Sequence, residues 1–195
     1  MKPAFLAAVA LAGACSLPAA HAAFSGALAP ALWTTTITGP TFSSSIDTST
    51  APASITLHGG NDAAGQGCPD GTLPGFVGGC QISFTIGGNA TYSFHWSYAS
   101  SDISPQYDSF GMLVDGVRTQ LVASGGDVLQ SGDRSVHANS SFGWYINCTD
   151  CTGGASLATI SQITAVPEPE TTALFGVGLL VLAAKRKALR RNVNA

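Results

Sequence analysis

Apolar and polar residues alternate along two neighbouring stretches in the middle of the chain. Over residues 92–98 every second position is aromatic, and the positions between carry serine or histidine. Residues 82–86 show the same period, and a Gly-Gly-Asn turn at 87–89 separates the two stretches. A period of two is typical of a β-strand with one buried and one exposed face. The pattern predicts a first hairpin in which Trp96 faces the core and His95 faces solvent.

A second hairpin is predicted around Asp115-Gly116, which lies between strand-forming runs at 110–114 and 117–122. An Asp-Gly pair in this setting favours a type I′ turn, because both residues tolerate a positive φ. Further strands are predicted over residues 33–38, 54–58, 142–147 and 155–164. Because short strands recur without a sustained helical period, the sequence predicts an all-β fold. We expect an antiparallel β-sandwich or jelly-roll-like single domain over residues 23–166.

Residues 1–22 have the composition of an export signal. A basic residue precedes an apolar stretch at 4–17, which is shorter than the roughly 20 residues that a membrane-spanning helix needs. An A-x-A sequence then places small residues where signal peptidase requires them. We therefore expect cleavage between Ala22 and Ala23 and export of the chain from Ala23 onward.

Residues 167–195 carry a second targeting signal. The uncharged run at 171–184 would form a helix about 21 Å long, against about 30 Å for a bilayer core, and snorkelling and local thinning can close that gap. The basic tail, residues 185–191, contains Lys185, Arg186, Lys187, Arg190 and Arg191. The positive-inside rule keeps this tail in the cytoplasm. We expect a short C-terminal transmembrane helix, with the domain outside the inner membrane.

Pro167-Glu168-Pro169, the apolar run after it and the basic cluster resemble the PEP-CTERM sorting signal of Gram-negative bacteria. The resemblance implies recognition by exosortase, a membrane-embedded cysteine protease, and cleavage near the Pro-Glu-Pro motif. The protein would then be anchored transiently and would end at the cell surface or in the extracellular matrix. A simple tail anchor with a proline-rich stem is the alternative, since proline keeps the segment extended in either case.

The middle of the chain is also similar to a β-sandwich ectodomain that recurs beside PEP-CTERM signals. The matching features are Trp33, residues 47–57, residues 94–98, Asp102, residues 107–111 and Asp115-Gly116. This resemblance implies the same fold and no particular activity. The spacing between Tyr107-Asp108 and Asp115-Gly116 also resembles that of CUB-type sandwiches, and this resemblance implies calcium as a ligand.

The predicted domain is acidic and nearly free of bases. Residues 23–166 contain nine aspartates and two arginines, and neither lysine nor glutamate. This composition argues against nucleic acid as a partner, because phosphates demand Lys and Arg.

Four cysteines remain after removal of the signal: Cys68, Cys80, Cys148 and Cys151. An even number in an exported domain favours disulfides. Three pairings are open, and we favour Cys68–Cys80 with Cys148–Cys151, because each joins cysteines of one local loop. The CxxC at residues 148–151 leaves a redox pair or a zinc site as alternatives. It comes directly after a predicted strand, however, and no histidine lies at a regular ligand spacing from it.

The usual catalytic motifs are missing, since the sequence has no GxSxG, no HExxH and no Gly-rich phosphate loop. No nucleophile can be named beside His95, so we expect no enzyme activity. Asp102, Asp108 and Asp115 lie in predicted loops or turns, where aspartate either forms the turn or binds calcium. No cofactor other than calcium is expected.

The sequence thus predicts an exported, exosortase-processed protein of the cell surface or extracellular matrix with a structural or adhesive role. The alternative is a calcium-assisted carbohydrate-binding module of the exopolysaccharide matrix. A hydrolase would need a pair of aspartates that the sequence does not identify. The expected partners are signal peptidase, exosortase, the inner membrane before processing and exopolysaccharide.

Overall fold

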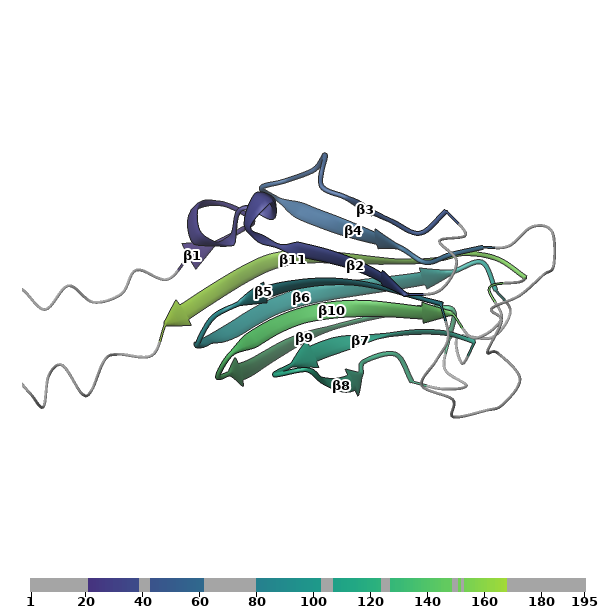
Figure 1. Ribbon diagram of the computed structural model, residues 1–195. Helices are drawn as coiled ribbons and strands as arrows, with labels where there is room; N and C mark the ends of the chain where they lie inside the picture. The colour runs from purple at the N-terminus through teal and green to yellow at the C-terminus, as the bar shows by residue number, and fades with distance from the viewer. Residues whose placement is uncertain are drawn as a thin grey trace, which may run out of the picture.

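Two antiparallel sheets pack face to face (Figure 1) in the computed structural model, which describes residues 21–38, 43–61, 80–102, 107–123, 127–148, 151 and 153–167. The first sheet has six strands: β1 (His21–Ala22), β3 (Ser45–Asp47), β4 (Ser54–His58), β6 (Ala90–Ser100), β9 (Leu129–Ala138) and β11 (Ser156–Pro167). The second has five: β2 (Thr34–Thr38), β5 (Cys80–Gly87), β7 (Asp108–Val114), β8 (Val117–Gln120) and β10 (Ser141–Cys148). Two short 3-10 helices, η1 (Gly26–Leu28) and η2 (Pro30–Leu32), precede β2.

The strand order is that of a jelly roll. The six-stranded sheet has the order β3-β4-β11-β6-β9, with β1 beside β11, and the five-stranded sheet has the order β2-β5-β10-β7-β8. The last eight strands form the pattern of two interleaved Greek keys, β4-β11-β6-β9 against β5-β10-β7-β8. This confirms the all-β, antiparallel sandwich predicted from the alternation.

One of the two predicted hairpins is wrong and the other is correct. Residues 82–86 lie in β5 of one sheet and residues 92–98 lie in β6 of the other, so the turn at 87–89 crosses between the sheets. The alternation of apolar and polar residues cannot distinguish a hairpin within one sheet from a turn that crosses between sheets, because in both cases the two strands point an apolar face at the same core. The second hairpin joins β7 to β8, and Asp115 and Gly116 have φ of 52° and 80°, as a type I′ turn requires.

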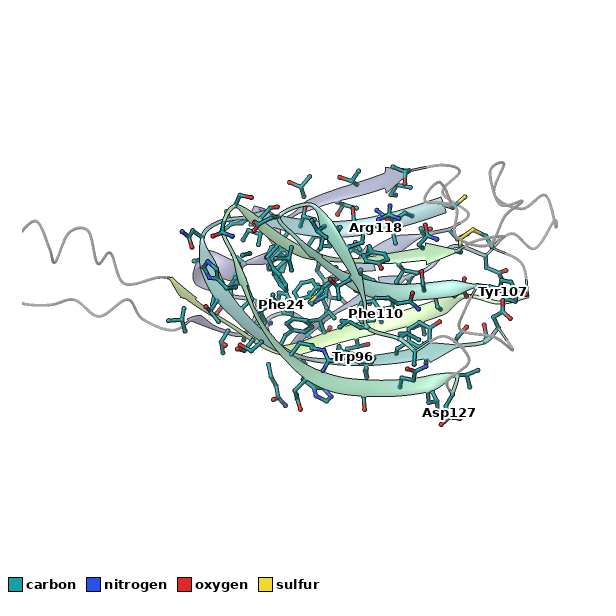
Figure 2. The ribbon with its side chains drawn as sticks, turned by 90° about the horizontal axis from the view of Figure 1, so that it is seen from below. Phe24, Trp96, Tyr107, Phe110, Arg118 and Asp127 are labelled. Carbon is teal, nitrogen blue, oxygen red and sulfur yellow. A yellow bond between two sulfur atoms is a disulfide. The ribbon has the colours of Figure 1, made fainter. Side chains whose placement is uncertain are left out.

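The core between the sheets is rich in aromatic side chains. The Trp33 ring stacks on Trp144 at 5.0 Å between centroids and on Phe84 at 5.1 Å. Trp96 is 3% exposed and its ring lies 5.7 Å from that of Phe110. Figure 2 shows Phe24, Trp96 and Phe110 pointing into the space between the sheets. The predicted burial of the Trp96 face of β6 is confirmed.

Among the described residues no helix is long and apolar enough to cross a membrane. The helix predicted over residues 171–184 lies outside the described residues.

Candidate functional sites

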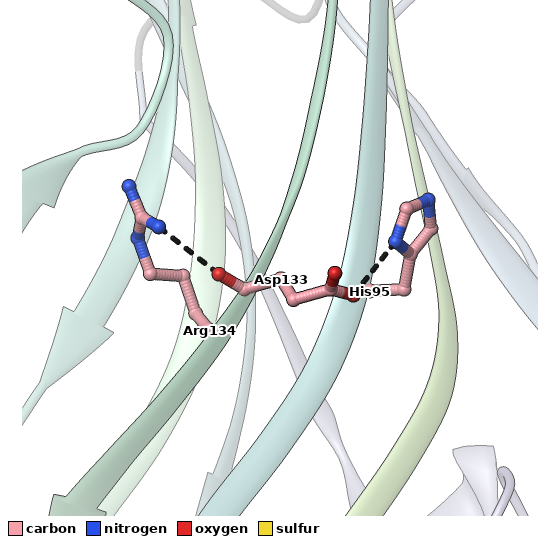
Figure 3. A network of polar contacts seen from close by, with 3 residues as sticks. All are labelled: His95, Asp133 and Arg134. Carbon is pink, nitrogen blue, oxygen red and sulfur yellow. Dashed lines mark hydrogen bonds and ion pairs between the residues drawn. The ribbon is translucent and has the colours of Figure 1, made fainter.

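A histidine–aspartate pair lies on the outer face of the six-stranded sheet. His95 in β6 is in register with Asp133 in β9, and its Nδ1 lies 2.8 Å from the Asp133 carboxylate (Figure 3). The His95 and Asp133 side chains are 36% and 82% exposed. Arg134 donates from Nη1 to the backbone carbonyl of Asp133 at 3.0 Å, and it extends away from His95.

This pair borders a shallow pocket of about 340 Å³. Its lining consists of Ser93, Phe94, His95, Asp133, Arg134, Ser135 and Gln162. Gln162 belongs to a β-bulge, where the register of β11 against β6 shifts between Ser161 and Thr164, and its φ is 53°. A positive φ is uncommon for a residue other than glycine, and bulges gather near functional sites, so this strained position marks the pocket as a candidate site.

The pocket offers hydrogen-bonding groups, and the polar side-chain contact of His95 among the described residues is with Asp133. Ser161 is in register with His95, yet no hydrogen bond joins their side chains. Within the described part of the chain, no hydroxyl or thiol bonds to the second ring nitrogen of His95. A nucleophile and its base must lie within hydrogen-bond reach. The imidazole, carboxylate, amide and hydroxyl groups of the pocket can donate and accept hydrogen bonds.

A second group of polar residues is buried at one end of the sandwich. Asp102 is 6% exposed and Asp108 is 1% exposed. The Ser100 hydroxyl accepts a hydrogen bond from the Asp102 backbone N–H at 3.0 Å and lies 3.5 Å from the Asp108 carboxylate, to which it donates. The Tyr98 hydroxyl donates to the Asp108 carbonyl at 2.7 Å. Burial raises the pKa of Tyr98 to about 12, and the charges of Asp108 and Asp102 also raise it.

The basic side chains of the domain are few, and each has a contact of its own. Its only two arginines are Arg118 and Arg134, and it has no lysine. Arg118 lies over the Tyr145 ring at 5.3 Å, and Arg134 lies beside Asp133. Calcium prefers carboxylate and other oxygen ligands, and the side chains of Asp102, Asp108 and Ser100 carry such oxygens.

Asp115, the third predicted calcium ligand, does not join this group. Its carboxylate accepts hydrogen bonds from the backbone N–H groups of Asn139, Ser140 and Ser141. The side chains of Asn139 and Ser140 donate to it as well. These contacts, the Asn139 side chain foremost, hold the pKa of Asp115 well below its usual range. Asp115 therefore fixes the turn between β9 and β10. These hydrogen bonds satisfy its carboxylate oxygens without an ion.

The cysteines gather at the ends of β5 and β10. A disulfide joins Cys148 to Cys151, as predicted. Cys80 is opposite Cys148 in the sheet and is disulfide-bonded; Cys68, its predicted partner, lies outside the described residues. The three Sγ atoms of Cys80, Cys148 and Cys151 lie within 4.8 Å of one another. The disulfide occupies two of these sulfurs, which disfavours the zinc alternative.

The targeting residues lie at the two ends of the described chain. Ala22 ends β1, and Ala23 comes next with a φ of 69°. Pro167 is the last residue of β11. Glu168, Pro169, Lys185, Arg186, Lys187, Arg190 and Arg191 lie outside the described residues.

A family model matches the tail, and the solved structures that resemble the chain are distant. The family model for the PEP-CTERM protein-sorting motif matches residues 165–187. No curated protein matches the chain. The K3 cleaved adhesin domain of Lys-gingipain from Porphyromonas gingivalis W83 is 11% identical with a TM-score of 0.37, over 71% of this chain and 92% of that domain.

Two further solved structures resemble the chain to a similar extent. The K1 cleaved adhesin domain of the same gingipain is 9% identical with a TM-score of 0.35, over 77% of this chain and 98% of that one. The C-terminal CBM6 of LamC from Zobellia galactanivorans is 12% identical with a TM-score of 0.31, over 66% of this chain and 100% of that one. All three TM-scores lie below 0.5, and we draw neither topology nor function from them. The chain is an all-β domain that carries a PEP-CTERM protein-sorting motif, a signal for export and for transient membrane anchoring before exosortase processing.

Proposed function

We propose that the domain is a non-catalytic, adhesive component of the cell surface or extracellular matrix, delivered there by exosortase. The ligand would be a hydroxyl-rich polymer, such as exopolysaccharide, bound at the outer face of the six-stranded sheet. The observation that carries this proposal is the open pocket where the His95–Asp133 pair meets the strained Gln162. Imidazole, carboxylate, amide and hydroxyl groups can donate to and accept from sugar hydroxyls.

Binding to purified exopolysaccharide and to a glycan array tests this role. We expect His95→Ala and Gln162→Ala to weaken binding at least severalfold, because each removes a hydrogen-bonding group from the pocket. Thr36→Ala, on β2 of the opposite sheet, serves as the matched control and should bind as the parent does. Unchanged binding in both pocket variants would contradict the proposed face, and release of oligosaccharides from the same glycans would contradict the non-catalytic role.

A calcium-assisted version of this function is favoured by the Asp102–Asp108 group. Two buried aspartates contact one hydroxyl: the Asp108 carboxylate accepts a hydrogen bond from Ser100, and the Asp102 backbone N–H donates one to it. The ion would stabilise this end of the sandwich and would leave the pocket at His95 unchanged. Binding to the glycan that is lost in EDTA and restored by calcium would support this version over the first.

A further inference from the structure

The two ends of the described chain meet on one sheet. His21 and Ala22 of β1 pair antiparallel with Ala165 and Thr164 of β11. Figure 1 shows β1 and the end of β11 at the same end of the sandwich. These segments contain the predicted signal-peptidase site and the start of the sorting motif. The sites of the two processing reactions are therefore neighbours in space, although more than half of the chain separates them in sequence.

The predicted cut between Ala22 and Ala23 would remove β1 and leave the rest of the sheet in place. The Ala23 N–H donates to the Ile163 carbonyl at 2.6 Å, and the Phe24 N–H donates to the Pro52 carbonyl at 3.0 Å. Phe24 is 2% exposed, and its ring lies 6.2 Å from that of Trp144. The new terminus is thus held by its own contacts, and the effect of the cut is confined to the two residues of β1.

Loss of β1 opens one edge of β11. On that side β11 pairs with β4 only from Leu157 to Ser161. Beyond the bulge, β1 is its one partner on this side among the described residues, whereas β6 pairs with its other side as far as Pro167. An open edge presents unpaired N–H and C=O groups and is a template for an added strand.

The opened edge includes the first residues of the sorting motif. The match to the PEP-CTERM model begins at Ala165, the residue opposite His21, and β11 continues to Pro167, opposite Ala90. The motif therefore begins inside the folded sheet, with its backbone already extended. A partner that binds extended peptides through backbone hydrogen bonds would find such a strand at this edge.

We propose that removal of the signal peptide uncovers the edge of β11 at Thr164 to Pro167, and that exosortase docks there by strand addition before it cleaves. The signal-peptidase cut then precedes the sorting cut, because β1 occupies the docking edge until it is removed. This inference rests on the proposed exosortase processing and is independent of the ligand proposed for the His95 pocket.

The test compares two exported chains in a host that contains exosortase. Both extend to Ala195 behind the same foreign signal peptide; one begins at Ala23 after its removal, and the other begins at Ala20 and so retains β1. Intact mass establishes the first residue of each. In a pulse–chase experiment we expect the chain that begins at Ala20 to lose its sorting tail roughly three- to tenfold more slowly. This factor corresponds to the net free energy of the one or two backbone hydrogen bonds that must break before exosortase can dock.

A third chain separates strand pairing from the mere presence of extra residues. His21→Pro in the chain that begins at Ala20 removes the backbone N–H opposite Ala165, and proline does not continue a ladder. We expect this variant to be processed as fast as the chain that begins at Ala23, with the same melting temperature.

Equal rates for the Ala20 and Ala23 chains would overturn the docking edge and leave exosortase processing intact. A His21→Pro chain as slow as its parent would also overturn it, since bulk rather than pairing would then cause the delay. Tail loss in none of the chains, in cells that process another PEP-CTERM substrate, would contradict the exosortase processing itself and the docking edge with it.

Discussion

The carboxylate of Asp115 accepts a hydrogen bond from the side-chain amide of Asn139 at 3.0 Å and so ties two turns of the sandwich together. Asp115 lies in the turn between β7 and β8, and Asn139 lies in the turn between β9 and β10. Because β7 and β10 are neighbours in one sheet whereas β9 belongs to the other, this contact fixes where the chain crosses between sheets.

The Asp115 contacts predict a loss of stability in acid. These contacts lower the pKa of Asp115, so the folded protein keeps this carboxylate ionised at pH values below the usual pKa of about 3.9. The stabilisation is present above that value and is lost as the pH falls below it, because the unfolded chain takes up the proton first. We expect Asp115→Asn to melt lower than the parent at pH 7 and the difference to shrink between pH 5 and pH 3. Thermal melts over this range measure it, and a constant difference would contradict the assignment.

Burial of Trp96 beside exposure of His95 predicts opposite effects of two neighbouring substitutions. Trp96 is 3% exposed and lies against Phe110. Truncation of such a side chain to alanine costs about 3–5 kcal/mol through lost burial and the cavity that remains. We expect Trp96→Ala to lower the melting temperature by roughly 10 °C and His95→Ala to leave it nearly unchanged. An unchanged Trp96→Ala melt, with glycan binding abolished, would instead make Trp96 a ligand platform.

The alternation of apolar and polar residues was enough to predict the strands that have one apolar face. The predicted strand at 54–58 coincides with β4, and those at 82–86, 92–98 and 142–147 lie within β5, β6 and β10. The sequence did not reveal β9, because this strand lies at the edge of its sheet and only its last residue, Ala138, is buried. An edge strand needs few apolar residues, so its Gly, Asp and Arg residues resemble a loop.

The candidate pocket could not be predicted from the sequence because β9, which forms part of it, was not predicted. His95 could be placed on the polar face from the alternation alone, but its partner Asp133 is in β9. Gln162 reaches the pocket through a β-bulge, and one extra residue within a strand leaves no clear sign in the sequence. Likewise, Asp102 and Asp108 could be named as candidate ligands, whereas their burial beside Tyr98 depends on how the two sheets pack.

The Cys148–Cys151 disulfide predicts a modest loss of stability when both cysteines are replaced by serine. The two residues are separated by only three positions, so the closed loop is short. In the chain-entropy model a loop of this size contributes about 2 kcal/mol to the free energy of unfolding. Denaturant unfolding of the double variant should show a loss of this order, and non-reducing peptide mapping should recover the linked peptide. Free thiols or one equivalent of zinc in the native protein would contradict the disulfide.

The Asp102–Asp108 group predicts that calcium stabilises the domain. Binding to the folded state alone raises the free energy of unfolding by about 2.7 kcal/mol when the free ion is at a hundred times its dissociation constant. We expect the domain to melt at a higher temperature in millimolar calcium than in EDTA. We expect Asp108→Asn to abolish this difference, because Asp108 is almost fully buried and no side chain at the surface can take its place as a ligand. Asp127→Asn is the matched control, since Asp127 lies at the surface near the same end of the sandwich (Figure 2) and should leave the calcium response intact. If the parent melts at the same temperature in calcium and in EDTA, the two carboxylates hold no ion, and the calcium-assisted version of the proposed function is contradicted.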